Sequence, residues 1–127
     1  MIQRIGVVGA GQMGNGIAHV CALAGLNVRL LDLTDEQLVE AMAAMERNMD
    51  RQVRRGLYDE LAKSEALARI ETNTDMAVLG DCDMVIEAVF EDMELKKSIF
   101  KELDEICKPG ALLASNTSAL DVNEIAS

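Results

Sequence analysis

Six residues near the N-terminus have the types and the spacing needed to hold a diphosphate. They form a GxGxxG pattern whose members are Gly9, Ala10, Gly11, Gln12, Met13 and Gly14. The second glycine lets the backbone approach phosphate oxygens, and the third lets a helix pack closely on a strand. A helix that begins here also offers free N–H groups and the positive end of its dipole. Because glycines occur in many turns, the surroundings of the pattern decide its interpretation.

An acidic residue follows the pattern at a position where it could bind the ribose of a dinucleotide. Asp32 comes directly after the apolar segment Asn27–Leu31, 23 positions after Gly9. A carboxylate there can accept hydrogen bonds from a ribose 2′-hydroxyl and would repel a 2′-phosphate. A simple turn or helix-cap role for Asp32 remains the alternative. The whole constellation predicts a dinucleotide site that prefers NAD to NADP.

Polar residues also follow two later apolar segments. Glu91 comes after Met84–Val89, and the run Ser115–Ser118 comes after Ala111–Ala114. In a parallel sheet these residues would reach the same edge as the glycine loop, where a hydroxyl can bind a nicotinamide amide or a substrate oxygen. Ser118 could equally cap the next turn with Asp121. Position alone leaves both interpretations open.

The elements that would position these residues alternate along the chain. Short β-branched runs alternate with helical patterns, which predicts an α/β fold with a doubly wound parallel sheet. The expected strands are Ile5–Val8, Asn27–Leu31, a short strand within Ile70–Thr74, Met84–Val89 and Ala111–Ala114. The expected helices begin at Gly11–Gly14, after Thr34, at Asp59 and at Glu94, and the second and third form a helical-hairpin insertion after the second strand.

Helical periodicity predicts which side chains of the first two helices face the core. Met13, Ile17, Cys21 and Ala24 share one face of the first helix. His19 lies about 200° around from Ile17 at the helical angle per residue, so we expect it to be partly exposed and not to act as a catalytic base. The second helix should begin with a capping box, because Thr34 is followed three residues later by Gln37.

The second helix carries a basic face on an acidic protein. Arg47, Arg51, Arg54 and Arg55 lie together on a helical wheel. The opposite side holds an apolar stripe that we expect to pack in the core, formed by Leu38, Met42, Met45, Met49 and Val53. The arginines are either a solvated face or an anion site suited to the phosphates of coenzyme A.

Composition narrows the function classes. The chain has 127 residues, a net charge of −10 and an isoelectric point near 4.4, so we expect neither nucleic acid nor a membrane surface as partner. No apolar run approaches the roughly 20 residues of a membrane span. Three scattered cysteines and one histidine give too few ligands for a structural metal site, so we expect reduced thiols and a cytoplasmic location.

Three separated segments carry a family resemblance. The segments GAGQMGNGIAHVCALAGLNVRLLD, IEAVFEDMELKKSIFKELD and ASNTSAL resemble the N-terminal domain of the 3-hydroxyacyl-CoA dehydrogenases, most closely the bacterial 3-hydroxybutyryl-CoA type. The resemblance runs over nearly the whole chain. It implies an NAD-binding (Rossmann) domain of an oxidoreductase in fatty acid metabolism, which moves a hydride between (S)-3-hydroxyacyl-CoA and 3-ketoacyl-CoA.

The resemblance also implies roles for individual residues. Gly9 to Gly14 match the pyrophosphate loop, and Asp32 matches the ligand of the adenosine ribose. Glu91 and Lys96 match residues on the nicotinamide side, where Asn116 is also expected to bind the cofactor. Ser118 matches the active-site serine that hydrogen-bonds the substrate's 3-oxygen. Asn48 and Arg55 match positions that contact coenzyme A.

One departure from the family pattern is large. The family's catalytic histidine, its orienting glutamate and the helical domain for substrate and dimerisation would follow Ser127. We therefore expect residues 1–127 to be an NAD-binding domain that is inactive alone, and we expect a homo-oligomer, with apolar surface near Ala111–Ala114 free to associate. Two alternatives remain: another NAD-dependent hydroxyacid dehydrogenase, or a noncatalytic NAD-binding module.

Overall fold

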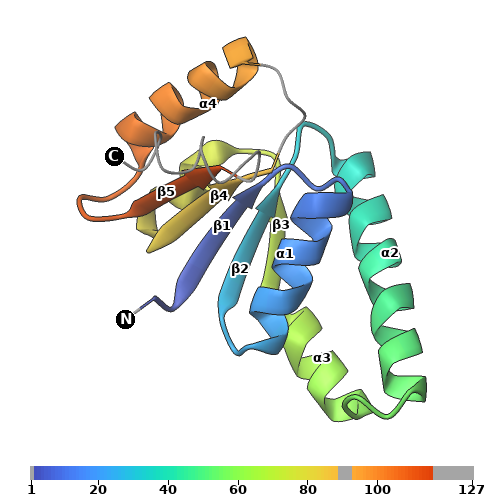
Figure 1. The fold of residues 1–127 in the computed structure, drawn as a ribbon. Helices are drawn as coiled ribbons and strands as arrows, with labels where there is room; N and C mark the ends of the chain where they lie inside the picture. Colours follow the sequence, from blue (N-terminus) through green and yellow to red (C-terminus); the bar gives the residue numbers. More distant parts are fainter. Residues whose placement is uncertain (1, 89–92, 116–127) are drawn as a thin grey trace.

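The chain folds into one parallel sheet flanked by helices. The computed structural model describes residues 2–88 and 93–115, with the side chains of 93–96, 114 and 115 left aside. The elements are β1 (Arg4–Val8), α1 (Gln12–Leu23), β2 (Asn27–Leu31), α2 (Asp35–Arg54), α3 (Glu60–Ala68), β3 (Ile70–Asn73), the 3₁₀ helix η1 (Met76–Asp81), β4 (Met84–Glu87), α4 (Met93–Ile106) and β5 (Leu112–Ser115). The predicted α/β doubly wound fold is confirmed (Figure 1).

The strand order places a crevice beside β1. The described strands run β3-β2-β1-β4-β5, all parallel, so the chain builds outward on one side of β1 and then crosses to the other. Val8 pairs with Leu31 on one side and with Glu87 on the other. The segments that follow these three residues therefore meet at one edge of the sheet, where doubly wound folds bind their ligands.

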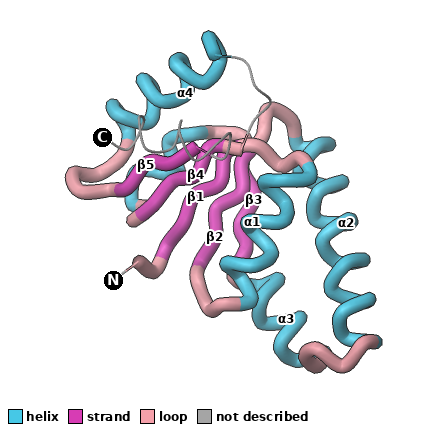
Figure 2. The backbone as a smooth tube through the Cα atoms, in the orientation of Figure 1, coloured by secondary structure: helices cyan, strands magenta, loops and turns pink. Residues whose placement is uncertain are grey.

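Helices cover both faces of the sheet (Figure 2). α1, α2 and α3 lie on one face, whereas η1 and α4 lie on the other. Successive residues of β1 point to opposite faces, so Val7 belongs to the first core with Leu30, and Val8 belongs to the second with Leu31 and Leu79. Both faces are covered by helices, which is why these strands are apolar without alternation. In the described ranges, no helix has the length and apolar character needed to span a membrane.

The packing of α1 corrects two expectations from periodicity. Met13 is 56% exposed, and Ala24, the C-cap residue of α1, is exposed too, so neither lies in the core. His19 is only 7% exposed and not on a partly open face. α1 lies very close to the strands at Gly14, so the residues that face the sheet must be small. They are Gly14, Ala18 and Ala22. α2 and α3 cover the adjoining part of α1, which buries His19, about 60° around the helix from Ala22. The buried side of α1 therefore extends from Gly14 through Ala18 and Ala22 to His19, and it is a different side from the one that periodicity predicts.

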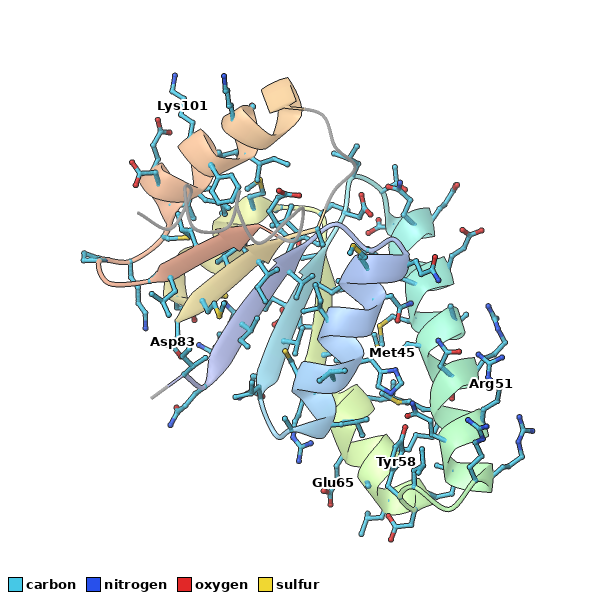
Figure 3. All side chains as sticks on the ribbon, in the orientation of Figure 1. Met45, Arg51, Tyr58, Glu65, Asp83 and Lys101 are labelled. Carbon is cyan, nitrogen blue, oxygen red and sulfur yellow. The ribbon has the colours of Figure 1, made fainter. Side chains whose placement is uncertain are left out.

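The beginning of α2 and its apolar stripe agree with the sequence. The hydroxyl of Thr34 accepts from the Gln37 N–H at 3.2 Å, and the Gln37 side chain accepts from the Thr34 N–H at 3.1 Å, so the predicted capping box is confirmed. Met45 and Met49 are fully buried, so their predicted packing role is confirmed too. Figure 3 shows Met45 between α2 and α1.

A partly exposed lysine joins α2 to α3. The side chain of Lys63 on α3 is 12% exposed, and its Nζ lies 2.5 Å from Asp50 and 3.4 Å from Glu46, both on α2. The hydrogen bond to Asp50 raises the pKa of Lys63 above its ordinary value. These ion pairs therefore link the two consecutive helices.

Candidate functional site

The glycine loop leaves the N-terminus of α1 open. Gly9 turns the chain with a φ of +106°, and its N–H donates to the Leu31 carbonyl at 2.7 Å. A Cβ on Gly14 would lie 1.6 Å from the Gly9 carbonyl oxygen, so only glycine allows this approach. Gly11 is the N-cap residue of α1 and receives no side-chain cap, and a Cβ there would meet no described atom within 4 Å. The first and third glycines thus build the loop, and the second faces open space.

Asp32 is held against this loop. Its Oδ2 accepts from the Ala10 N–H at 2.8 Å, and its Oδ1 accepts from the Leu33 N–H at 2.7 Å. Each carboxylate oxygen keeps a second lone pair for another donor, such as a hydroxyl. Asp32 therefore has the structural role that the sequence offered as one alternative and keeps spare capacity for a ligand, whose binding there stays a prediction.

A hollow of about 420 Å³ opens between the glycine loop, Asp32 and the first half of α2. Its lining residues are Ala10, Gly11, Gln12, Asn15, Gly16, Asp32, Gln37, Glu40, Ala41, Ala44 and Asn48. One wall is the open N-terminus of α1, which favours anions, and another carries the carboxylates of Asp32 and Glu40, which favour hydroxyl donors. This arrangement fits the adenosine and pyrophosphate of a dinucleotide without a 2′-phosphate.

A second, larger hollow of about 700 Å³ lies farther along the same two helices. It is lined by His19, Asn48, Arg51, Gln52, Arg54 and Arg55. The two hollows adjoin, because Asn48 lines both. Its Oδ1 accepts a hydrogen bond from Arg51. Three arginines around one opening make it suitable for a multiply charged anion.

Several predicted site residues lie outside what the structure describes. Glu91, Asn116 and Ser118 belong to the ranges left aside, and Lys96 lies within α4 with its side chain not described. They stay predictions. The strands before them do reach the expected edge, because Glu87 at the end of β4 pairs with Val8 and with Ser115 at the end of β5.

Some residues of the two hollows escaped the sequence reasoning. Gln37, Glu40 and Ala44 were not predicted to line a site, and with the predicted Asn48 they recur along α2 at intervals of three or four residues, which marks one side of a helix. That polar strip beside the methionine stripe was a usable signal. Gln52 continues the same spacing, four residues after Asn48 and three before Arg55. The part played by Asn15, whose side chain donates to the Ala41 carbonyl at 2.7 Å, had no such signal.

Comparison with known proteins agrees with this geometry. Residues 4–127 match the family described as the 3-hydroxyacyl-CoA dehydrogenase, NAD binding domain. The chain is 46% identical over 126 residues to a 3-hydroxybutyryl-CoA dehydrogenase of Bradyrhizobium diazoefficiens, covering 99% of this chain and 43% of the relative. It is 39% identical over 124 residues to a 3-hydroxybutyryl-CoA dehydrogenase of Clostridioides difficile, covering 98% of this chain and 44% of that relative.

The same similarity holds in three dimensions. The crystal structure of (S)-3-hydroxybutyryl-CoA dehydrogenase from Ralstonia eutropha superposes with a TM-score of 0.92 and 38% identity, covering all of this chain and 46% of that one. The chain thus spans less than half the length of these relatives. Its glycine loop, Asp32 and parallel sheet are the parts that a dinucleotide requires, and the chain belongs to the 3-hydroxyacyl-CoA dehydrogenase family as its NAD-binding domain.

Proposed function

We propose that the protein interconverts (S)-3-hydroxyacyl-CoA and 3-ketoacyl-CoA with NAD, and that 3-hydroxybutyryl-CoA is its substrate. The observation that carries this proposal is the meeting of two hollows at Asn48, one with the features of a dinucleotide site and one lined by arginines. An enzyme that binds both a dinucleotide and a phosphorylated thioester needs two such sites. The similar proteins that are named 3-hydroxybutyryl-CoA dehydrogenases support the same substrate.

The residues of the first hollow would bind and orient the cofactor. The free N–H groups at the start of α1 would bind the pyrophosphate, with Gly11 giving it room. Asp32 would accept hydrogen bonds from the adenosine ribose. Bound NAD⁺ supplies the hydride acceptor. We propose that Glu91, Lys96 and Asn116 lie on its nicotinamide side, as the family resemblance implies.

The residues of the second hollow would bind the nucleotide end of coenzyme A. The guanidinium groups of Arg54 and Arg55 suit phosphate oxygens, and the amide of Asn48 can both donate and accept. Of the described residues, none forms an ion pair with either arginine, so their charges are available to a ligand.

The proton of the reaction needs a base. In the oxidation, a hydride leaves C3 of the substrate and the hydroxyl proton leaves its oxygen, so the C–O bond becomes a carbonyl. We propose that Ser118 hydrogen-bonds this oxygen and that a histidine with an orienting glutamate, placed after Ser127, takes the proton. His19 does not suit that task, because it is buried on α1 and bonded to Gln52, about two turns from the glycine loop.

The experiment is NADH oxidation by the purified protein with acetoacetyl-CoA, beside acetoacetate as the substrate without coenzyme A and NADPH as the other cofactor. We expect turnover with NADH and acetoacetyl-CoA only. Turnover with free acetoacetate would favour another hydroxyacid dehydrogenase. NADH binding without any turnover by the full-length protein would favour a noncatalytic module. The 127-residue chain alone should oxidise NADH about 10²–10⁴-fold more slowly, because it lacks the acid–base group.

We also propose that the protein works in the cytoplasm as a homo-oligomer. The three cysteines of the chain are free thiols, which suits a reducing compartment.

On β5, the outermost described strand on its side of the sheet, the side chain of Leu112 is 56% exposed and available to an apolar contact. Sedimentation velocity of the 127-residue chain should show self-association that Leu112→Lys reduces, whereas a wild-type monomer at high concentration would contradict this role of β5.

A further inference from the structure

His19 joins three parts of the chain next to the arginine-lined hollow. It is 7% exposed, and its Nε2 lies 3.0 Å from Oε1 of Gln52 on α2. The hydroxyl of Tyr58, in the connection between α2 and α3, donates to the same oxygen and lies 3.5 Å from the imidazole Nε2. Because an amide oxygen can only accept, Nε2 carries the hydrogen and the imidazole donates. Figure 3 shows Tyr58 between α2 and α3.

Gln52 links this network to the end of α2. Its side-chain oxygen accepts hydrogen bonds from His19 and Tyr58. Its backbone carbonyl accepts a hydrogen bond at 3.1 Å from the N–H of Leu57, which follows the helix. Between these points the chain turns at Gly56, whose φ is +79° and whose N–H donates to the Val53 carbonyl at 2.9 Å. The arginines of the hollow stand on this same last turn and cap of α2, on either side of Gln52. Gln52 therefore connects the last turn of α2 to α1 and to the segment that follows the helix.

The surrounding charges leave the hollow positive. On the α3 side, the ammonium of Lys63 is already paired with Asp50 and Glu46, so those carboxylates are engaged away from the hollow. Burial raises the pKa of Tyr58 above its ordinary value, so the phenol keeps its proton and stays a donor to Gln52. The polar groups of the network satisfy one another, and none of the described residues that line the hollow beside the arginines carries a carboxylate.

We infer that His19 is a positioning residue for the arginine-lined hollow: its Nε2–H holds Gln52, and through Gln52 it holds the end of α2 so that Arg54 and Arg55 can bind a phosphorylated nucleotide. This inference rests on the proposed function, since it assigns the hollow to the nucleotide end of coenzyme A. A long arginine side chain loses much rotamer freedom when it binds, so a fixed backbone beneath it lowers the cost of binding.

The variants are chosen by where they place a donor. His19→Leu removes it and keeps an apolar side chain of similar bulk. His19→Gln places an amide Nε2 the same number of bonds from the backbone as the imidazole Nε2, whereas the amide of His19→Asn is one bond too short. Tyr58→Phe removes the second donor to Gln52 and keeps the ring. Affinities of the purified protein for 3′,5′-ADP and for NAD are measured by calorimetry, beside the melting temperature.

We expect His19→Leu and His19→Asn to weaken 3′,5′-ADP binding about three- to tenfold, the size that one neutral hydrogen bond supports. His19→Gln should stay within about twofold of the wild type, and Tyr58→Phe should shift in the same direction as His19→Leu. NAD affinity should change little in all four. A His19→Leu protein that folds and binds 3′,5′-ADP as the wild type does would overturn the inference, as would a His19→Gln protein that is no better than His19→Leu.

A kinetic comparison separates positioning from general damage. For His19→Leu, the KM for acetoacetyl-CoA should rise while kcat and the KM for NADH stay the same. With the N-acetylcysteamine thioester of acetoacetate, which lacks the nucleotide, His19→Leu and wild type should have equal kcat/KM. An equal loss with both thioesters would mean a merely structural role and overturn the inference. If the wild type binds no 3′,5′-ADP but turns over acetoacetyl-CoA, the inference fails while the proposed reaction stands.

Discussion

The Oδ2 of Asp32 accepts a hydrogen bond from the backbone N–H of Ala10 at 2.8 Å, so the end of β2 is tied to the glycine loop that precedes α1. This bond aligns the carboxylate along the wall of the hollow before any ligand arrives. It also means that the residue expected to choose between NAD and NADP helps to build the loop that holds the pyrophosphate. Changes at Asp32 should therefore affect both selectivity and affinity.

Replacing Asp32 should relax the choice of cofactor. Asp32→Asn removes the charge that would repel a 2′-phosphate, so the preference for NAD over NADP should shrink. Asp32→Ala should in addition lose about 1.5–3 kcal/mol of NAD binding, the usual worth of a hydrogen bond to a charged group. Calorimetric titration with both cofactors measures this. Glu36→Gln removes an exposed carboxylate of α2 that does not line the hollow, and it should leave the preference unchanged. Equal affinity of the wild type for both cofactors would contradict the role of Asp32.

Alanine substitutions at two glycines of the loop should have different effects, one on stability and the other on NAD affinity. Gly14→Ala forces a Cβ against the Gly9 carbonyl and should destabilise the fold by about 1–3 kcal/mol or more. Gly11→Ala meets no described atom and has a φ of −67° that alanine accepts, so the melting temperature should hold while NAD affinity falls at least about tenfold. Thermal unfolding and calorimetry give the two readouts. Gly16→Ala, also free of contacts and within α1, should be as stable as the wild type or more so. Unchanged NAD binding in Gly11→Ala would contradict the pyrophosphate role.

Charge reversal at the end of α2 should weaken coenzyme A binding alone. Arg54→Glu with Arg55→Glu places two negative charges where phosphates would lie, so acetoacetyl-CoA should bind at least about tenfold more weakly, each lost charged hydrogen bond being worth about 1.5–3 kcal/mol. NAD affinity should stay nearly unchanged. Arg47→Glu is the matched control, because Arg47 is exposed on the same helix and does not line the hollow. If neither ligand responds to the double variant, the arginines are only a solvated face.

A carboxylate far from the site should make stability depend on pH. Oδ2 of Asp83 accepts from the backbone N–H groups of Gln3 and Arg4 at 2.9 and 3.0 Å, and its Oδ1 lies 2.6 Å from Nζ of Lys108. The bond to Lys108, followed by the two backbone bonds, holds the pKa of Asp83 well below its ordinary value of 3.8. Because the folded-state pKa is lowered, this stabilisation is complete above about pH 4–5 and is lost as the pH falls below 3.8.

Asp83→Asn should therefore lower the melting temperature at pH 7 and narrow its difference from the wild type toward pH 2–3. Thermal unfolding followed by circular dichroism across this range measures the effect. Asp104→Asn, on an exposed position of α4, should have little effect at any of these pH values. A constant difference between Asp83→Asn and the wild type at every pH would show that the charge of Asp83 contributes nothing.

Local sequence signals determined the order and type of the elements. The strand Asn27–Leu31 has the bounds expected from its apolar run, and α2 begins at the capping box of Thr34 and Gln37. These features depend on residues within a few positions of one another, which is why they can be found without a fold. The GxGxxG pattern and Asp32 likewise predicted the cofactor, because the chemistry of a dinucleotide site requires those residue types at that spacing.

Only the tertiary structure decided which side chains meet across elements. His19 was expected on an exposed face, yet α2 and α3 cover it and bring Gln52 and Tyr58 to its imidazole. The same packing joins the two hollows at Asn48. Periodicity gives each helix one apolar side, but it cannot tell how many neighbours a helix has, because that number depends on where the following helices return along the sheet. The pairing of His19 with Gln52, across 33 positions of the chain, exists only once those helices are packed.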